Sequence, residues 1–168
     1  MATTTESFEE FFQVQYPRIC RALWLGLGDH CDPEDAAQEA FARAFRKWNY
    51  VSRLDRPATW VFVVAVREAR RQQRRRDSSP SAFPSGTESQ DPAAGVATHL
   101  TIIAALGQLA PRQRLAIVLR YHADLSVKQV AKVMQCREGT VKATLHAALG
   151  HLRTLPLDDR TTTEVDND

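Results

Sequence analysis

The sequence has few cysteines and no long hydrophobic run. Its three cysteines, Cys20, Cys31 and Cys136, lie far apart and lack the spacing of metal ligands. We therefore interpret them as reduced thiols. The longest apolar run, Trp60 to Val66, is too short to span a bilayer. The first residues lack the basic start and apolar core of a secretory signal. These absences predict a cytoplasmic protein without membrane insertion.

Clear signals for β-strands are also absent, so we expect an all-α protein. The histidines form no cluster with the cysteines or with carboxylates, which leaves no pattern of catalytic residues or metal ligands. We therefore expect a protein that is not an enzyme and needs no cofactor and no metal. The histidines are His30, His99, His122, His146 and His151.

The net charge of +2 conceals a strong segregation of charge along the chain. Residues 43–76 hold eleven Lys and Arg against two Asp and Glu, and residues 98–155 hold eight against two. Residues 1–42, 77–97 and 156–168 are each net acidic. Two basic blocks separated by an acidic spacer favour two surfaces that face a polyanion, and nucleic acid is the partner that this pattern indicates.

Residues 77–97 have the composition of a flexible linker, with three Pro, two Gly, five Ser and no basic residue. They divide the chain into two small helical domains, about residues 6–76 and 98–155, followed by an acidic tail, 156–168, that we expect to be disordered. The linker spans at most about 70 Å when extended and about 25 Å as a coil. Either reach suits two domains that bind separate sites on one DNA.

The first domain is predicted to be a helical bundle. Ser7 and Glu10 have the spacing of a capping box, and Pro17 is expected to stop or kink the helix that follows. Asp32 is a good N-cap for the next long helix, and Pro33 suits its first position. Apolar residues then recur at steps of three and four on one face: Ala37, Phe41, Ala44, Phe45 and Trp48.

A further helix is expected from Pro57 through the arginine-rich segment that ends near residue 76. Valine-rich segments can form strands, but here the apolar run passes without a break into Ala, Arg and Gln. At 100° per residue, Trp60 and five arginines lie within one arc of the helix. A solvated surface helix more often interleaves glutamates with its arginines. We call these five residues the arginine stripe: Arg67, Arg70, Arg71, Arg74 and Arg75.

The segment "SVKQVAKVMQCREGTVKATLHAAL", residues 126–149, reads as two amphipathic helices joined by a very short turn. Ser126 and Gln129 form a second capping-box pattern. Two helices with so short a turn bury both apolar faces only by crossing steeply, which predicts a helix-turn-helix. The alternative is a plain helical hairpin. In a helix-turn-helix the second helix enters the major groove, and its polar residues here are Arg137, Glu138, Thr140, Lys142, Thr144 and His146.

The chain resembles a bacterial RNA polymerase sigma factor of the sigma-70 family, extracytoplasmic-function (ECF) subfamily. The resemblance is carried, in order, by "DPEDAAQEAFARAFRKW", by "RPATWVFVVAVREARRQQRRR" and by "LGQLAPRQRLAIVLRYHADLSVKQVAKVMQCREGTVKATLHAALGHLR". It implies a subunit that binds core RNA polymerase and directs it to specific promoters. It also implies region 2-like and region 4-like domains, and a possible anti-sigma factor as a further partner.

The resemblance implies roles for individual residues. Asp35, Gln38, Glu39 and Phe41 would bind the polymerase clamp coiled coil, and "LAPRQR" would dock on the flap. Trp60 and the arginine stripe would melt and hold the −10 element, because aromatic and guanidinium groups stack on bases and neutralise phosphates. The helix-turn-helix would read the −35 element through Ser126, Lys128, Arg137, Glu138, Thr140, Lys142, Thr144 and His146.

Some residues depart from the family pattern. Val66 and Arg67 stand where Arg-Asn is frequent, and Thr144 and Ala147 stand where arginines are frequent. Gln135 replaces a turn glycine. Arg137 replaces an N-cap serine, a loss of about 1 kcal/mol. Fewer arginines mean fewer phosphate contacts, so we expect weak or unusual −35 binding and a stronger dependence on polymerase.

Two other functions remain open from the sequence. A helix-turn-helix regulator could bind duplex DNA without polymerase, but this reading leaves the acidic helix and Trp60 without a role. A small nuclease could use the carboxylates near residues 32–39 as metal ligands, yet carboxylates at a helix start more often stabilise the helix dipole. Those carboxylates are Asp32, Glu34, Asp35 and Glu39.

Overall fold

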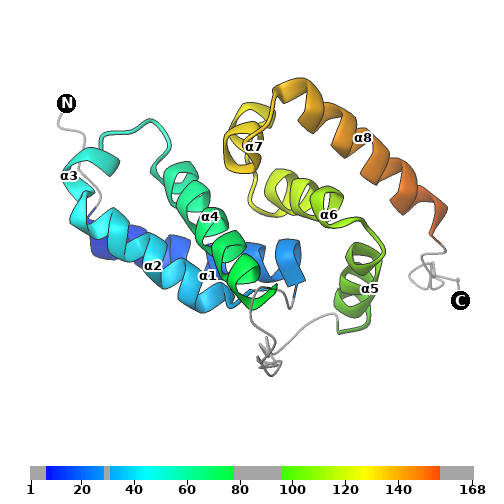
Figure 1. Cartoon of the computed structure of the whole chain (residues 1–168), viewed down its shortest axis with the longest axis horizontal. Helices are drawn as coiled ribbons and strands as arrows, with labels where there is room; N and C mark the ends of the chain where they lie inside the picture. Colours follow the sequence, from blue (N-terminus) through cyan, green and yellow to red (C-terminus); the bar gives the residue numbers. More distant parts are fainter. Residues whose placement is uncertain (1–6, 29–30, 78–95, 156–168) are drawn as a thin grey trace, which may run out of the picture.

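The computed structural model describes residues 7–28, 31–77 and 96–155, and its described residues form helices without strands. The predicted linker and the predicted acidic tail therefore lie almost wholly outside the described residues. Figure 1 shows helices α1 to α4 on one side of the molecule and α5 to α8 on the other. No helix among these residues combines the length and apolar character needed to cross a membrane.

Helix α1 (Phe8–Leu27) begins at the predicted capping box. The Glu10 backbone N–H donates to Ser7 Oγ at 3.2 Å, and the Ser7 N–H donates to Glu10 Oε2 at 3.0 Å. We expected Pro17 to stop or kink this helix; a stop is excluded, because α1 continues through Pro17, and a kink stays a prediction. Pro17 removes the donor for the Gln13 carbonyl. Both residues are exposed, so water can hydrogen-bond to that carbonyl instead.

Helices α2 (Pro33–Arg46), α3 (Trp48–Val51) and α4 (Pro57–Asp77) complete the first half. Helix α2 packs against both α1 and α4. Its start follows the prediction, since the Asp35 N–H donates to Asp32 Oδ1 at 3.0 Å and Pro33 takes the first position. The apolar face differs at one place: Phe45 is 64% exposed, although its ring lies 4.9 Å from that of Phe8.

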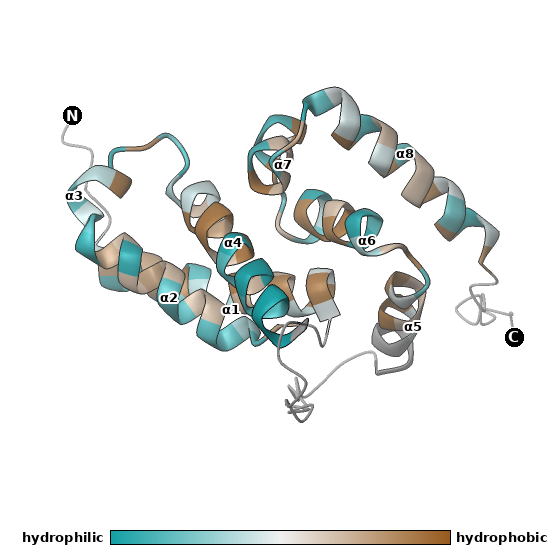
Figure 2. Ribbon diagram, in the orientation of Figure 1, coloured by the Kyte–Doolittle hydropathy of each residue, from teal (hydrophilic) through white to brown (hydrophobic). Residues whose placement is uncertain are grey.

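The second half contains α5 (Val96–Gly107), α6 (Pro111–Ile117), a π-helical turn η2 (Val118–His122), α7 (Val127–Met134) and α8 (Glu138–Thr154). Arg114 connects α5 to α6, because its guanidinium donates to the carbonyls of Leu106 at 2.9 Å and Gly107 at 3.2 Å. Apolar side chains from α6, η2, α7 and α8 form one core, which includes Leu115, Leu119, Val130, Val133 and Val141. Figure 2 shows hydrophobic residues on these helices alternating with polar ones.

The two halves pack directly against each other. Helix α1 contacts α6 and η2, and α4 contacts α7. The buried side chains of both halves belong to one continuous hydrophobic cluster. A pair of domains on a flexible tether does not require such contact, so the closed arrangement is a property that the linker composition alone did not indicate.

Candidate nucleic-acid interface

Helix α4 has a buried side and an exposed side. Val61, Phe62, Ala65, Val66 and Ala69 are all nearly inaccessible and pack in the core with α1 and α2. This apolar spacing fixes the rotation of the helix, so the residues on the opposite side must face outward. The first part of that side carries partly buried apolar residues that cover the core, namely Trp60, Val63 and Val64.

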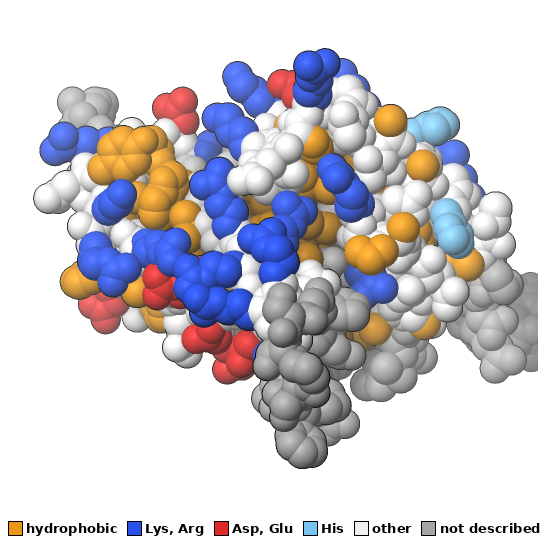
Figure 3. Space-filling model, in the orientation of Figure 1, with side chains coloured by type: hydrophobic (Ala, Val, Ile, Leu, Met, Phe, Trp, Pro, Cys, Tyr) orange, Lys and Arg blue, Asp and Glu red, His pale blue; other side chains and the backbone are white. Residues whose placement is uncertain are grey.

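The arginine stripe continues this outward side toward the end of α4. Arg67, Arg71, Arg74 and Arg75 are exposed, and Arg70 is half-buried. Burial is the main cause that lowers the pKa of Arg70, and the positive charges of Arg112 and Arg74 lower it further. Figure 3 shows blue side chains gathered over α4 and across toward the second half of the molecule. The stripe therefore forms part of a broader basic surface.

Glu68 places a nearly buried carboxylate within the stripe. Glu68 is 9% exposed and faces Arg71 at 3.5 Å, while Arg43 of α2 approaches its other oxygen at 3.4 Å. Because two arginines approach this one carboxylate, the local charge stays positive. The surface can thus bind phosphate groups, which prefer guanidinium forks.

Arg67 makes a contact that sequence reasoning did not find. In the amide orientation that satisfies its surroundings, Gln135 Oε1 accepts hydrogen bonds from Arg67 Nε at 2.7 Å and Nη2 at 3.0 Å. Gln135 lies in the turn of the helix-turn-helix, so this bond joins the two halves. No local sequence pattern relates residues so far apart in the chain.

The acidic side chains of α2 are held by neighbours. Gln72 of α4 donates from Nε2 to Asp35 Oδ2 at 2.5 Å, and Gln72 Oε1 accepts from the Asp32 N–H at 3.2 Å. Glu39 pairs with Arg43 at 2.6 Å and with Arg46 at 3.8 Å. The hydrogen bond from Arg43 is the main cause that lowers the pKa of Glu39. Gln72 is a second residue that sequence reasoning missed.

The four residues expected to bind polymerase do not share one environment. Asp35 and Gln38 are exposed and Glu39 is partly exposed, so these three lie at the surface of α2. Phe41 is 2% exposed. Its ring packs against those of Phe8, Phe11 and Phe12, with centroids 5.0 to 6.5 Å apart. Phe41 therefore belongs to the core between α1 and α2, because its inward position on the helix leaves it no access to a partner.

The helix-turn-helix forms as predicted from α7 and α8. The Gln129 N–H donates to Ser126 Oγ at 3.3 Å, and the Ser126 N–H donates to Gln129 Oε1 at 2.7 Å. Gln135 ends α7 in the left-handed conformation, with φ 56° and ψ 47°. Helix α8 begins after Arg137, whose side chain makes no capping bond. This matches the predicted absence of a side-chain cap.

The start of α8 presents polar side chains to solvent. Arg137, Glu138, Thr140, Lys142 and His146 are exposed, as are Ser126 and Lys128 of the preceding segment. Thr144 is only partly exposed, and its hydroxyl donates to the Thr140 carbonyl at 2.7 Å. Its hydrogen is therefore used within the helix. Val141, Leu145 and Ala148 are buried on the opposite side, which fixes this orientation.

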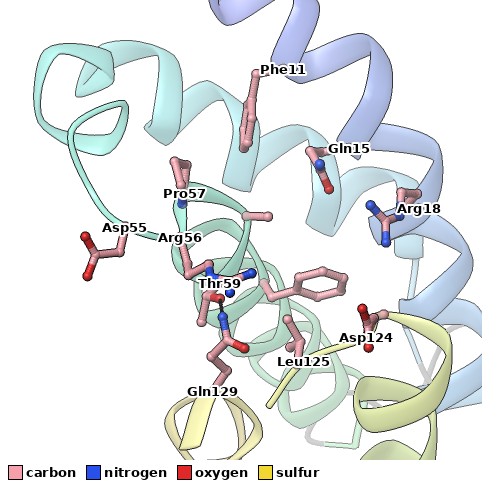
Figure 4. A pocket seen from close by; sticks show the side chains of 13 residues that line it. Phe11, Gln15, Arg18, Asp55, Arg56, Pro57, Thr59, Asp124, Leu125 and Gln129 are labelled. Carbon is pink, nitrogen blue, oxygen red and sulfur yellow. Dashed lines mark hydrogen bonds between the residues drawn. The ribbon is translucent and has the colours of Figure 1, made fainter. Parts of the chain in front are cut away.

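A groove lies where the first half meets the second. Figure 4 shows residues around it from α1, such as Phe11 and Arg18, from the segment that leads into α4, such as Arg56, and from the segment before α7, such as Leu125. On its wall Gln129 Nε2 donates to the buried Thr59 Oγ1 at 2.8 Å, drawn as a dashed line in Figure 4. The sequence reasoning treated Gln129 only as a capping residue and missed this second bond.

The nuclease alternative finds no geometric support. Within the part of the chain that the structure describes, no three His, Cys, Asp or Glu side chains group in a way that could hold a metal ion. Asp32 caps α2, Asp35 binds Gln72, and Glu39 pairs with arginines. These carboxylates thus act within the fold.

Comparison with known proteins agrees with this arrangement. The family model described as sigma-70 region 2 matches residues 12–79, and that described as sigma-70, region 4, matches residues 99–152. The sigma factor RpoE of Bartonella quintana, solved with the anti-sigma factor NepR, has the same fold. Its TM-score is 0.72 at 24% sequence identity, over 91% of this chain and 98% of that one.

Curated relatives cover most of both sequences. The ECF RNA polymerase sigma factor SigL of Mycobacterium tuberculosis is 35% identical over 149 residues, which are 82% of this chain and 84% of the relative. The RNA polymerase sigma-E factor of Streptomyces coelicolor is 28% identical over 87% of this chain and 84% of the relative. Both sigma-70 regions and full-length similarity disfavour a regulator that acts without polymerase. The chain therefore belongs to the ECF sigma factors of the sigma-70 family, the subunits that bind core RNA polymerase and direct it to promoter DNA for transcription initiation.

Proposed function

We propose that the sigma factor works through three separate surfaces, as a non-enzymatic initiation subunit in the cytoplasm. The surface of α2 with Asp35, Gln38 and Glu39 docks on the clamp coiled coil of core polymerase. Trp60 and the arginine stripe hold the −10 element. The helix-turn-helix and "LAPRQR" serve the −35 element and the flap. The corresponding domains are residues 6–76 and 98–155, joined by the linker 77–97.

The observation that carries this proposal is the two-sided nature of α4. One side is packed into the core, so the other must present Trp60 and the stripe together. An aromatic ring followed by a row of guanidinium groups fits a single strand, in which bases are free to stack and phosphates follow at regular steps. Duplex DNA offers no unstacked base to Trp60.

The −10 role is tested with the double variant Arg74→Gln and Arg75→Gln in the holoenzyme. Both side chains are exposed, so folding is preserved. Each lost phosphate contact reduces the slope of log K against log salt by about 0.7 for single-stranded DNA. We expect weaker binding to a −10 strand and a slope reduced by about 1.4. The matched control is Arg153→Gln, an exposed arginine at the far end of α8. If the double variant and the control have equal salt-dependence slopes, the arginine stripe does not bind the −10 strand.

The promoter is tested by run-off transcription with core polymerase, followed by sequencing of the start sites. A shared upstream motif among the enriched starts supports selective initiation. Weak dependence of those starts on the −35 sequence is the expected result, because α8 has Thr144 and Ala147 where arginines are frequent in the family. A strong dependence of initiation on the −35 sequence would contradict the expected weak −35 binding.

An anti-sigma factor is a further partner that we propose on similarity. The structural relative RpoE was solved in complex with an anti-sigma factor. Such a partner would compete with polymerase for the same surfaces. If an inhibitor co-purifies with the sigma factor, its removal should restore run-off transcription. If deletion of each candidate inhibitor gene leaves transcription from the target promoters unchanged, the proposed partner is contradicted.

A further inference from the structure

The hydrogen bonds at the start of α2 include a residue from α4. In a capping box, the side chain of the third helical residue accepts the N–H of the N-cap residue, as Glu10 does in α1 and Gln129 does in α7. In α2 the third residue is Asp35, and the N–H of the N-cap Asp32 instead donates to Gln72 Oε1 at 3.2 Å. Gln72 therefore completes the start of α2 from a neighbouring helix.

The same amide also holds the Asp35 carboxylate. Gln72 Nε2 donates to Asp35 Oδ2 at 2.5 Å, while the Asp35 N–H donates to Asp32 Oδ1 at 3.0 Å. Because the amide oxygen accepts an N–H and the amide nitrogen donates to a carboxylate, the orientation of the amide is fixed. Gln72 is partly buried, whereas Asp35 is exposed. Asp35 is thus held in one place and yet accessible to a partner.

Gln72 is a neutral residue in a strongly basic segment. Residues 70–76 of α4 hold five arginines and two glutamines. An arginine at position 72 would form an ion pair with Asp35 and offset its charge. An amide donates a hydrogen bond without adding a positive charge. The carboxylate is therefore oriented while its negative charge is kept.

Glu39, the other acidic residue of the proposed docking surface, has a different environment. Its Oε1 lies 2.6 Å from Arg43 Nε and 3.8 Å from Arg46 Nη2. These two guanidinium groups belong to the same helix and offset the charge of Glu39. A basic group of a partner would have to compete with them for Glu39, whereas at Asp35 it meets a carboxylate that a neutral amide holds.

We propose that Gln72 is a positioning residue for core polymerase, which orients the Asp35 carboxylate for a basic side chain of the polymerase and leaves its charge available. The proposal rests on the proposed docking role of α2. Asp35, more than Glu39, is then the electrostatic anchor of the docking surface. Because Gln72 lies on the helix that carries the arginine stripe, one side chain also joins the docking surface to that helix.

Two substitutions at position 72 separate positioning from folding. Gln72→Met keeps the length of the side chain and removes both hydrogen bonds. Gln72→Arg provides a donor that pairs with Asp35, so α2 and α4 stay joined while the charge of Asp35 is offset. Gln73→Met is the matched control, because it makes the same change at a partly buried glutamine one residue further along α4.

Affinity for core polymerase and the melting temperature are measured for each full-length variant. We expect Gln72→Met to bind core polymerase about two- to tenfold more weakly, the range of one lost hydrogen bond. Gln72→Arg should show a loss of similar size although its melting temperature is unchanged or higher, because an ion pair replaces the amide contact. Gln73→Met should bind as the unaltered chain does. Affinities that follow the melting temperature across the variants overturn the proposal, since Gln72 then only holds two helices together.

A double-variant cycle gives a second readout. Because Gln72 acts through Asp35, Gln72→Met should cause no further loss of affinity in a chain that already carries Asp35→Ala. Losses that add independently contradict the positioning role.

The two levels of inference fail differently. If α2 does not dock through this surface, Asp35→Ala binds core polymerase as tightly as the unaltered chain. If only the role of Gln72 is wrong, Asp35→Ala loses affinity while Gln72→Met and Gln72→Arg do not.

Discussion

Gly26 of α1 lies against Leu115 of α6 so closely that a Cβ added to Gly26 would stand 2.9 Å from Leu115 Cδ1. Leu115 is 2% exposed and has little room to move. A single missing side chain thus permits the contact between the two halves. The closed arrangement depends on this close approach as well as on the polar bonds between α4 and α7.

Substitution of Gly26 should weaken this contact. Gly26→Ala is expected to cost about 1–3 kcal/mol through overpacking, partly offset by about 1 kcal/mol of improved helix propensity. Chemical unfolding measures the net loss. Gly150→Ala is the control, because nothing lies within 4 Å of the added Cβ and only the gain in propensity remains. Equal stabilisation by both changes would refute the close packing.

The N-cap of α2 is tested at Asp32. Its carboxylate accepts the Asp35 N–H at 3.0 Å. Asp32→Ala should lower the free energy of unfolding by about 1 kcal/mol. Asp32→Asn should lower it by much less, because an amide oxygen can also accept the capping hydrogen bond. Urea denaturation of the two variants checks this. Identical losses would show that charge, and not the cap, is what matters.

Phe41 and Gln38 should separate folding from polymerase binding. Phe41→Ala leaves a cavity among the aromatic rings of α1 and α2, so we expect a loss of about 3–5 kcal/mol in stability. Gln38→Ala removes an exposed side chain that hydrogen-bonds Tyr16, with a stability effect within about 1 kcal/mol. Only Gln38→Ala should reduce affinity for core polymerase while the melting temperature is kept. A fully stable Phe41→Ala variant with weakened polymerase binding would restore Phe41 to the docking surface.

His122 should make stability depend on pH. Burial, and then the charges of Arg21 and Arg18, lower its pKa below the ordinary 6.5. The unfolded chain therefore binds a proton more readily than the folded one, so stability falls as pH decreases below about 6.5. His122→Gln should flatten the curve between about pH 5 and 7. Because His122 keeps solvent contact, the effect is small, and thermal unfolding across this range measures it. An unchanged pH profile in the variant would exclude His122 as its source.

The helices and their caps were predictable because their signals are local. A serine three residues before Glu10 or Gln129, or an aspartate before Pro33, satisfies orphan N–H groups whatever the rest of the chain does. The buried sides of α4 and α8 followed from helical periodicity for the same reason. The helix did not stop at Pro17 because the cost of a proline depends on whether the freed carbonyl meets water, which a local pattern does not contain.

The candidate site was predictable in part. Periodicity placed Trp60 and the arginine stripe on one side of α4. It also placed Phe41 on the apolar face of α2, where Phe41 is buried, whereas the family resemblance grouped Phe41 with the exposed Gln38 as a docking residue. The partners of Arg67 and Thr59 are Gln135, the C-cap of α7, and Gln129 in its first turn, both far along the chain. Such contacts depend on how the halves dock.

By itself, the sequence determined the helices, their charged surfaces, the helix-turn-helix and the family. It did so because capping, periodicity and charge act over a few residues. Only the tertiary structure decided that α1 packs on α6 and α4 on α7, that Gln135 binds Arg67, and that Leu115 packs closely against Gly26. The physical reason is that a linker of this length allows many arrangements of two domains, and shape and hydrogen-bond complementarity between surfaces remote in sequence select one of them.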